Sequence, residues 1–177
     1  MVNGYRKIFW GILIANVHIN LELIQVLPAF LGWLVIFNGL TSITLEHSND
    51  AFKKAKLISI LLSGFTFITF IISFMQIEHM IFKYTFMVTE VLMLLFAYYL
   101  FAGSYESFRN KRNLDIAAYI NKIQRFYVTV FIINLFIMCT GYLLEIQGLV
   151  MIYLVIHFNL IIWLMYITHI LKREYNQ

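Results

Sequence analysis

Long apolar stretches constrain the fold of this chain more than any other feature of its sequence. Six of them follow one another along the 177 residues, at about 7–26, 29–45, 57–76, 82–103, 125–145 and 148–171. A helix needs about 20 mostly apolar residues to cross the roughly 30 Å hydrocarbon layer of a bilayer. Because lipid leaves backbone polar groups no outside partner, such stretches form helices. The sequence predicts an all-α membrane protein, with residues 1–177 forming a single bundle of six transmembrane helices.

The composition agrees with a lipid environment and excludes several other classes of protein. Hydrophobic residues make up 62% of the chain and charged residues only 12%, whereas soluble domains carry about a quarter charged residues. The single Cys139 excludes a disulfide scaffold. It is expected to be a small packing residue.

The first two apolar stretches are separated only by Leu27 and Pro28. Proline is tolerated in the first turn of a helix, and the residue before a proline disfavours helix. We therefore expect a turn at this point. Residues 7–45 then form either two full spans or a re-entrant hairpin, and both interpretations return the chain to the same side of the membrane.

The basic residues are distributed as the positive-inside rule requires. All but Lys83 lie before the first stretch, in alternate connections or after the last stretch, namely Arg6, Lys7, Lys53, Lys54, Lys56, Arg109, Lys111, Arg112, Lys122, Arg125, Lys172 and Arg173. Since Lys and Arg gather in cytoplasmic loops, both termini are predicted to lie on the cytoplasmic side of the membrane. The clusters form no continuous basic face, so the net charge of +4 predicts no nucleic-acid partner.

Residues 104–124 form the longest polar segment. Apolar residues such as Leu114 and Ile120 alternate there with basic ones such as Arg109 and Lys122, which predicts an amphipathic cytoplasmic connector. It either lies on the inner leaflet, attracted by anionic lipid, or is a solvated link between spans.

Small residues mark helix faces that can approach closely. Gly11 and Ala15 lie on one stripe of the first stretch together with His18 and Glu22, and this stripe must face protein or water. Ala29, Gly32 and Gly39 share one face of the second stretch, which suits close helix packing within a membrane. They are candidate contacts with another membrane protein or with a second copy of the chain, in addition to the lipid bilayer itself.

Three ionisable residues, His18, Glu90 and His157, fall within the apolar stretches, where such groups are costly and usually face a cavity or pathway. Each lies about eight or nine positions from the presumed outer end of its stretch, which is roughly 12–13 Å at the helical rise. Glu22 lies one turn from His18 on the same predicted helix face, and Asn134 is somewhat deeper. These five residues predict a ligand pocket that opens to the outside.

Several chemistries are compatible with such a pocket. The favoured hypothesis is binding of a small solute or cation, as carboxylates do in transporters. A metal-dependent membrane enzyme is the second, with His18, Glu90 and His157 as candidate ligands. A structural, immunity or envelope-stress protein is the third. We predict no cofactor and no catalytic residue, since no nucleophile or two-histidine zinc motif occurs.

The N-terminal part carries a recognisable series of residues: Phe9-Trp10-Gly11, Leu27-Pro28, Phe30, Gly32-Trp33, Gly39-Leu40, Ser48, Phe52 and Ala55. Over residues 8–55 the chain resembles the first hairpin of a group of small uncharacterised polytopic membrane proteins of low-GC Gram-positive bacteria. Ala29 stands where that group has an acidic residue. The resemblance implies a bacterial membrane location and no particular activity. The predicted architecture is also similar to the substrate-binding subunits of energy-coupling-factor vitamin transporters, which implies a transporter subunit.

Overall fold

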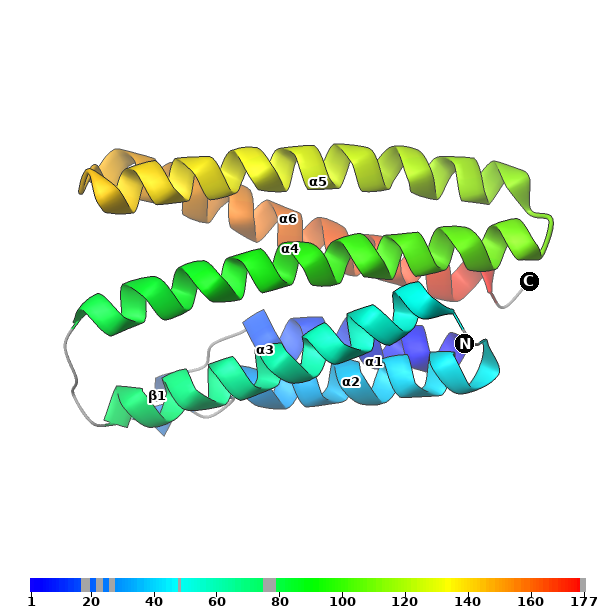
Figure 1. The fold of residues 1–177 in the computed structure, drawn as a ribbon, viewed down its shortest axis with the longest axis horizontal. Helices are drawn as coiled ribbons and strands as arrows, with labels where there is room; N and C mark the ends of the chain where they lie inside the picture. Colours follow the sequence, from blue (N-terminus) through cyan, green and yellow to red (C-terminus); the bar gives the residue numbers. More distant parts are fainter. Residues whose placement is uncertain (17–19, 22–23, 26–27, 48, 75–78, 176–177) are drawn as a thin grey trace.

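The structure is a computed structural model that describes residues 1–16, 20–21, 24–25, 28–47, 49–74 and 79–175. Within these residues the fold consists of helices and one very short hairpin (Figure 1). The elements in chain order are α1 (Val2–Asn16), β1 (Asn20–Leu21), β2 (Ile24–Gln25), α2 (Ala29–Glu46), α3 (Asp50–Phe74), α4 (His79–Asn110), α5 (Leu114–Leu143) and α6 (Gln147–Glu174). The all-helical bundle predicted from the sequence is confirmed.

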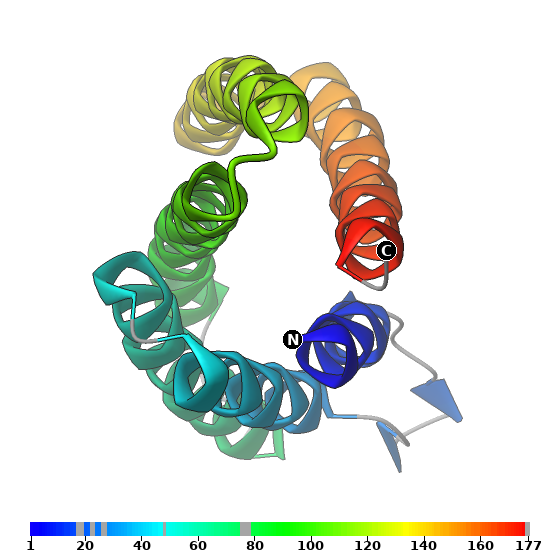
Figure 2. The same ribbon diagram turned by 90° about the vertical axis from the view of Figure 1, so that its right-hand side faces the viewer.

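The helices form a ring in chain order. Each packs against the next one, and α1 also packs against α6, which closes the ring (Figure 2). The two termini meet at one end of the bundle, where the ring centroids of Tyr5 and Tyr175 are 5.4 Å apart. The turns from α2 to α3 and from α4 to α5 lie at this same end (Figure 1), so we call it the terminal end.

In the described part of the chain, five helices are long and apolar enough to cross a membrane, namely α2 to α6. The protein is therefore a multi-pass helical membrane protein. Helix α1 has 15 residues, or about 22 Å at 1.5 Å per residue, which is shorter than the hydrocarbon layer. A sixth span remains a prediction.

The first predicted stretch ends earlier than expected. Helix α1 stops at Asn16, and β1 and β2 pair antiparallel, with Asn20 opposite Gln25, so the prediction of one helix over 7–26 was wrong. The Asn16 amide donates a hydrogen bond to the Ile12 carbonyl. This is a bond from a side chain to the backbone within the last turn of the helix. The second stretch begins as predicted, with Pro28 at the N-cap of α2.

The polar segment 104–124 is not a separate connector. Helix α4 continues to Asn110 and α5 begins at Leu114, so only a short turn joins them. Arg112 in this turn has a φ of 60°, and the Asn113 side chain caps α5 by accepting a hydrogen bond from the Ile116 backbone N–H. The prediction missed this because Ala117 and Ile120, taken as the apolar side of a surface helix, are the first buried residues of the α5 core face.

Glycines allow α1 and α2 to pack backbone against backbone. A Cβ placed on Gly32 would lie 2.5 Å from the Gly11 carbonyl oxygen, and one on Gly4 would lie 2.8 Å from the Gly39 carbonyl oxygen. Both contacts are closer than side chains allow. The predicted close approach on Gly32 and Gly39 is confirmed, and the structure shows that these residues pack against Gly11 and Gly4 of the same chain.

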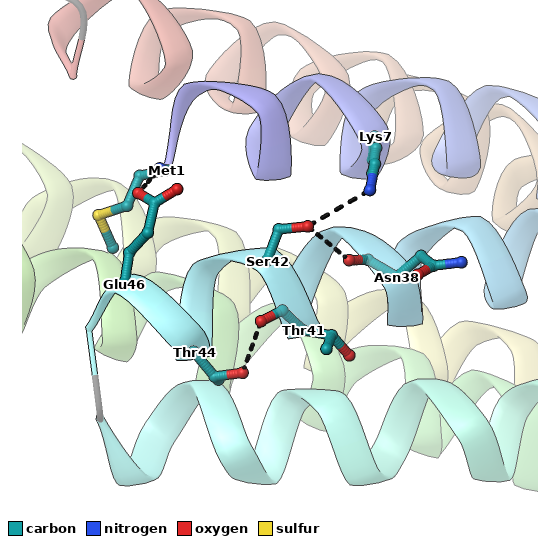
Figure 3. Close-up of polar contacts among 7 residues, drawn as sticks. All are labelled: Met1, Lys7, Asn38, Thr41, Ser42, Thr44 and Glu46. Carbon is teal, nitrogen blue, oxygen red and sulfur yellow. Dashed lines mark hydrogen bonds and ion pairs between the residues drawn. The ribbon is translucent and has the colours of Figure 1, made fainter.

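Polar contacts also join α1 and α2 near the terminal end (Figure 3). The Met1 amino group pairs with Glu46, and the Lys7 ammonium donates to the Ser42 hydroxyl at 3.3 Å. The Ser42 hydroxyl in turn donates to the Asn38 carbonyl. The α1–α2 pair is therefore held by close backbone packing along its length and by charge at its end.

Candidate functional site

The structure brings together Glu90 of α4 and His157 of α6. The His157 Nδ1 and Glu90 Oε2 atoms are 3.2 Å apart. The two atoms do not form a hydrogen bond. The contact is that of an imidazole ring lying against a carboxyl group. Glu90 is only 3% exposed. A buried carboxylate is costly unless it is paired, and His157 is its partner.

Two tyrosines surround this pair. Tyr127 on α5 and Tyr153 on α6 are fully buried, and both hydroxyls interact electrostatically with the Glu90 carboxyl. The Tyr153 ring lies 5.4 Å from the His157 ring, centroid to centroid. Tyr153 precedes His157 by one helical turn, which places both side chains on the same face of α6.

Asn134 lies on the buried face of α5, within about one helical turn of the pair. Helices α5 and α6 run antiparallel, the Phe131 and His157 rings are 6.4 Å apart, and Asn134 follows Phe131 by one turn. On the other side of α5, the Phe86 ring contacts the Tyr142 ring. In this antiparallel register Asn134 lies opposite residue 94, about one turn from Glu90.

We call Glu90, Tyr127, Asn134, Tyr153 and His157 the Glu90–His157 cluster. Its buried polar atoms form no well-oriented hydrogen bond among the residues that the structure describes, although the Glu90 carboxyl lies against His157 Nδ1 and interacts with the Tyr153 hydroxyl. These atoms are Glu90 Oε2, the Tyr127 and Tyr153 hydroxyls, Asn134 Oδ1 and Nδ2, and His157 Nδ1. Buried polar groups in proteins are nearly always satisfied. A concentration of such acceptors and donors on the buried faces of α4, α5 and α6 is the arrangement expected of a site that receives a polar ligand or water.

Aromatic rings enclose the cluster. Phe86 packs edge-on against Tyr153, and Phe131 packs against both Tyr127 and His157. A cation that enters such a site meets a carboxylate, carbonyl and phenol oxygens and the faces of aromatic rings. All of these attract positive charge.

The outcome for the sequence-predicted residues is mixed. Glu90 and His157 lie in contact, and Asn134 is buried on α5 within about one turn of their level. His18 and Glu22 lie outside the described residues. Their predicted helical stripe also included Gln25, which lies in β2 and not in a helix.

Sequence reasoning missed Tyr127 and Tyr153 as members of the site. The signal was available in the spacing, because Tyr153 lies four residues before His157 and Tyr127 lies seven before Asn134. These spacings place each pair on one helix face. Buried tyrosine hydroxyls on the same face as intramembrane polar residues would have identified them.

A metal centre gains no support from the described residues, which contain no group of three or more His, Cys, Asp or Glu side chains that could hold a metal ion. The predicted ligand set of His18, Glu90 and His157 includes one residue outside that part of the chain. Cys139 has a free thiol and is half-buried on α5.

Comparisons of the chain with protein-family models, with curated proteins and with solved structures give no match. The function must therefore be argued from the geometry of the molecule itself.

Proposed function

We propose that this protein is a multi-pass protein of the bacterial cytoplasmic membrane that binds a small solute or cation at the Glu90–His157 cluster. The observation that carries the proposal is the set of buried polar atoms on α4, α5 and α6 that lack a well-oriented hydrogen bond. Three helices each supply at least one such atom. A ligand bound among them would complete their hydrogen bonds and tie the three helices together.

The chemistry of the cluster favours a small cation or a solute with a cationic group. Four of the unsatisfied atoms are oxygens, from the Glu90 carboxylate, two phenols and the Asn134 amide. Oxygen ligands suit hard cations, and the surrounding rings suit an ammonium group.

The position of the cluster along the helices supports entry from the outside. Glu90 lies eleven residues from the start of α4 at His79 and twenty from its end at Asn110. The cluster is thus in the half of the bundle away from the terminal end. The basic residues gather near that terminal end, which the positive-inside rule assigns to the cytoplasm. A binding subunit of a transporter would have this arrangement.

Substitution of Glu90 by glutamine tests the proposal, because it removes the charge and keeps the shape. The matched control is Glu106→Gln, which removes the same charge from an exposed position on the same helix. We would measure the thermal stability of both purified variants in mild detergent against sodium, potassium and methylammonium chloride. Native mass spectrometry would detect any small molecule that copurifies.

We expect at least one of these cations, or a copurifying solute, to stabilise the native chain and the Glu106→Gln variant but not the Glu90→Gln variant. Equal responses of all three proteins would overturn the proposal. A copurifying transition metal that a chelator removes would also overturn it, in favour of a metal-dependent site.

A further inference from the structure

Helix α5 carries a second candidate site on the surface that points away from the bundle. A shallow hollow of about 450 Å³ is lined by residues of this one helix, namely Ala118, Asn121, Lys122, Arg125, Phe126 and Thr129. Ala118, Lys122 and Arg125 are exposed, whereas Ala117, Ile120 and Tyr127 on the opposite side are buried. The hollow therefore faces the surroundings of the bundle and is independent of the Glu90–His157 cluster.

The positively charged side chains of Lys122 and Arg125 both line this hollow, so they can contact one ligand together. Lys122 and Arg125 are three residues apart, so their side chains are neighbours on the helix surface. Within the described residues neither is paired with a carboxylate. Asn121 adds an amide and Thr129 a hydroxyl. These are the groups that bind a phosphate oxygen.

The length of α5 places the hollow at the boundary of the hydrocarbon layer. The helix has 30 residues and is about 45 Å long, whereas the layer is about 30 Å thick. Its end at Leu143 is apolar, so the excess lies at the basic end. Counting 30 Å back from Leu143 reaches the region between Lys122 and Arg125, where lipid phosphates lie.

Aromatic residues of neighbouring helices lie at the same depth in the bundle as the hollow. The Gln124 amide donates to the Tyr98 carbonyl at 3.3 Å, and the Phe126 ring lies 5.3 Å from the Trp163 ring. Tyrosine and tryptophan concentrate at the headgroup level of membranes. Beyond Thr129 the exposed residues of α5 are apolar, including Ile132, Ile133 and Phe136, and are suited to contact acyl chains.

We propose that the hollow on α5 binds the headgroup of an anionic phospholipid, with Lys122 and Arg125 on its phosphate and the acyl chains along the apolar surface towards Phe136. Charge complementarity and depth identify the occupant. A soluble phosphate would use the two cations but not the apolar surface beneath them.

Native mass spectrometry with defined lipids tests this site. The purified full chain in mild detergent would receive equal amounts of phosphatidylglycerol and phosphatidylcholine with the same acyl chains. We expect the native chain to retain phosphatidylglycerol preferentially. Each basic residue near anionic lipid strengthens binding about fivefold. The Lys122→Gln/Arg125→Gln variant should therefore lose roughly 25-fold of this preference.

The matched control is Lys172→Gln/Arg173→Gln, which removes one lysine and one arginine near the same end of the bundle but outside the hollow. It should keep the preference. A second variant, Ala118→Trp, fills the hollow and keeps both charges, and it should also lose the preference. Circular dichroism and gel filtration would establish that each variant is folded.

Equal losses in the two double variants would overturn the proposal, since general surface charge would then explain binding. Retention of the preference in Ala118→Trp would overturn it as well. Displacement of the lipid by millimolar inorganic phosphate would reassign the hollow to a soluble anion. None of these results depends on Glu90. The outcome of this test therefore does not affect the proposal for the Glu90–His157 cluster, and the outcome of that test does not affect this one.

Discussion

The Nδ1 atom of His157 lies 3.2 Å from the Oε2 atom of Glu90, which links α4 to α6 across the intervening helix α5. Both groups are costly within an apolar bundle. Their contact lets each offset the burial of the other. The pair therefore helps to hold α4 and α6 together, and it is also the centre of the candidate site.

Removal of one partner of this pair should destabilise the protein more than removal of both. His157→Leu leaves the Glu90 carboxyl buried without its partner, a change that costs about 3–5 kcal/mol in other buried pairs. Glu90→Leu combined with His157→Leu should recover much of this loss. Denaturant unfolding in detergent micelles would measure the free energies of unfolding of the native chain, of Glu90→Leu, of His157→Leu and of the double variant. Additive effects of the two single substitutions would contradict the coupling, and His169→Leu at an exposed position of the same helix serves as control.

The α1–α2 interface should not tolerate a single added methyl group. In Gly32→Ala the new Cβ meets the backbone of Gly11 and Ala15, so the helices must separate, at a cost of about 1–3 kcal/mol. Gly64→Ala on α3 has no neighbour within 4 Å and should stabilise its helix by up to about 1 kcal/mol. Thermal unfolding of the two variants would check the opposite signs. A neutral Gly32→Ala would show that α1 and α2 do not meet as closely as described.

The terminal end should face the cytoplasm. On a Cys139→Ala background, Asn113→Cys lies in the turn between α4 and α5, and Ile146→Cys lies at the opposite end of the bundle. In intact cells a membrane-impermeant maleimide should label Ile146→Cys alone, and permeabilised cells should show labelling of both. Labelling of Asn113→Cys in intact cells would reverse the orientation.

Tyr175 should make the stability of the terminal end sensitive to alkaline pH. Its ring packs 4.4 Å from the Phe108 ring, centroid to centroid, and burial raises the pKa of Tyr175 from 10.0 to about 12. A raised pKa in the folded state stabilises the protein fully below the unfolded value and loses this effect as the pH rises through the folded value. The window is therefore about pH 10 to 12.

The comparison with Tyr175→Phe isolates this effect, since phenylalanine cannot ionise and all other groups are shared. Between pH 9 and 12 the melting temperature of the native chain should fall more steeply than that of the variant. Parallel melting curves for the two proteins would show that Tyr175 ionises normally.

Much of the fold could be read from local sequence features. Helices α2 to α6 follow from apolar runs of membrane length, and the start of α2 follows from Pro28, which sets its own backbone angle. The close packing of α1 on α2 follows from the glycine spacing. The early end of α1 at Asn16 did not follow, because the residues after it are as apolar as those of a helix and hydropathy alone carries no turn signal there.

Only part of the candidate site could be predicted from local sequence features. Glu90, Asn134 and His157 are conspicuous because they are polar residues in apolar runs, and their depths could be counted along each helix. Their convergence depends on how each helix is rotated about its axis. Lipid is as apolar as the interior of the bundle, so the pattern of apolar residues does not reveal which face turns inward.

By itself, then, the sequence determined that this chain is helical and membrane-spanning, and it predicted on which side its termini lie, because apolar run length and charge act locally along the chain. Only the tertiary structure decided that Glu90 meets His157, that Tyr127 and Tyr153 join them, and that residues 104–124 belong to two long helices. Those outcomes depend on contacts between side chains of separate helices. Such contacts are set by how each helix is rotated and packed against its neighbours, which the local pattern of apolar residues does not specify.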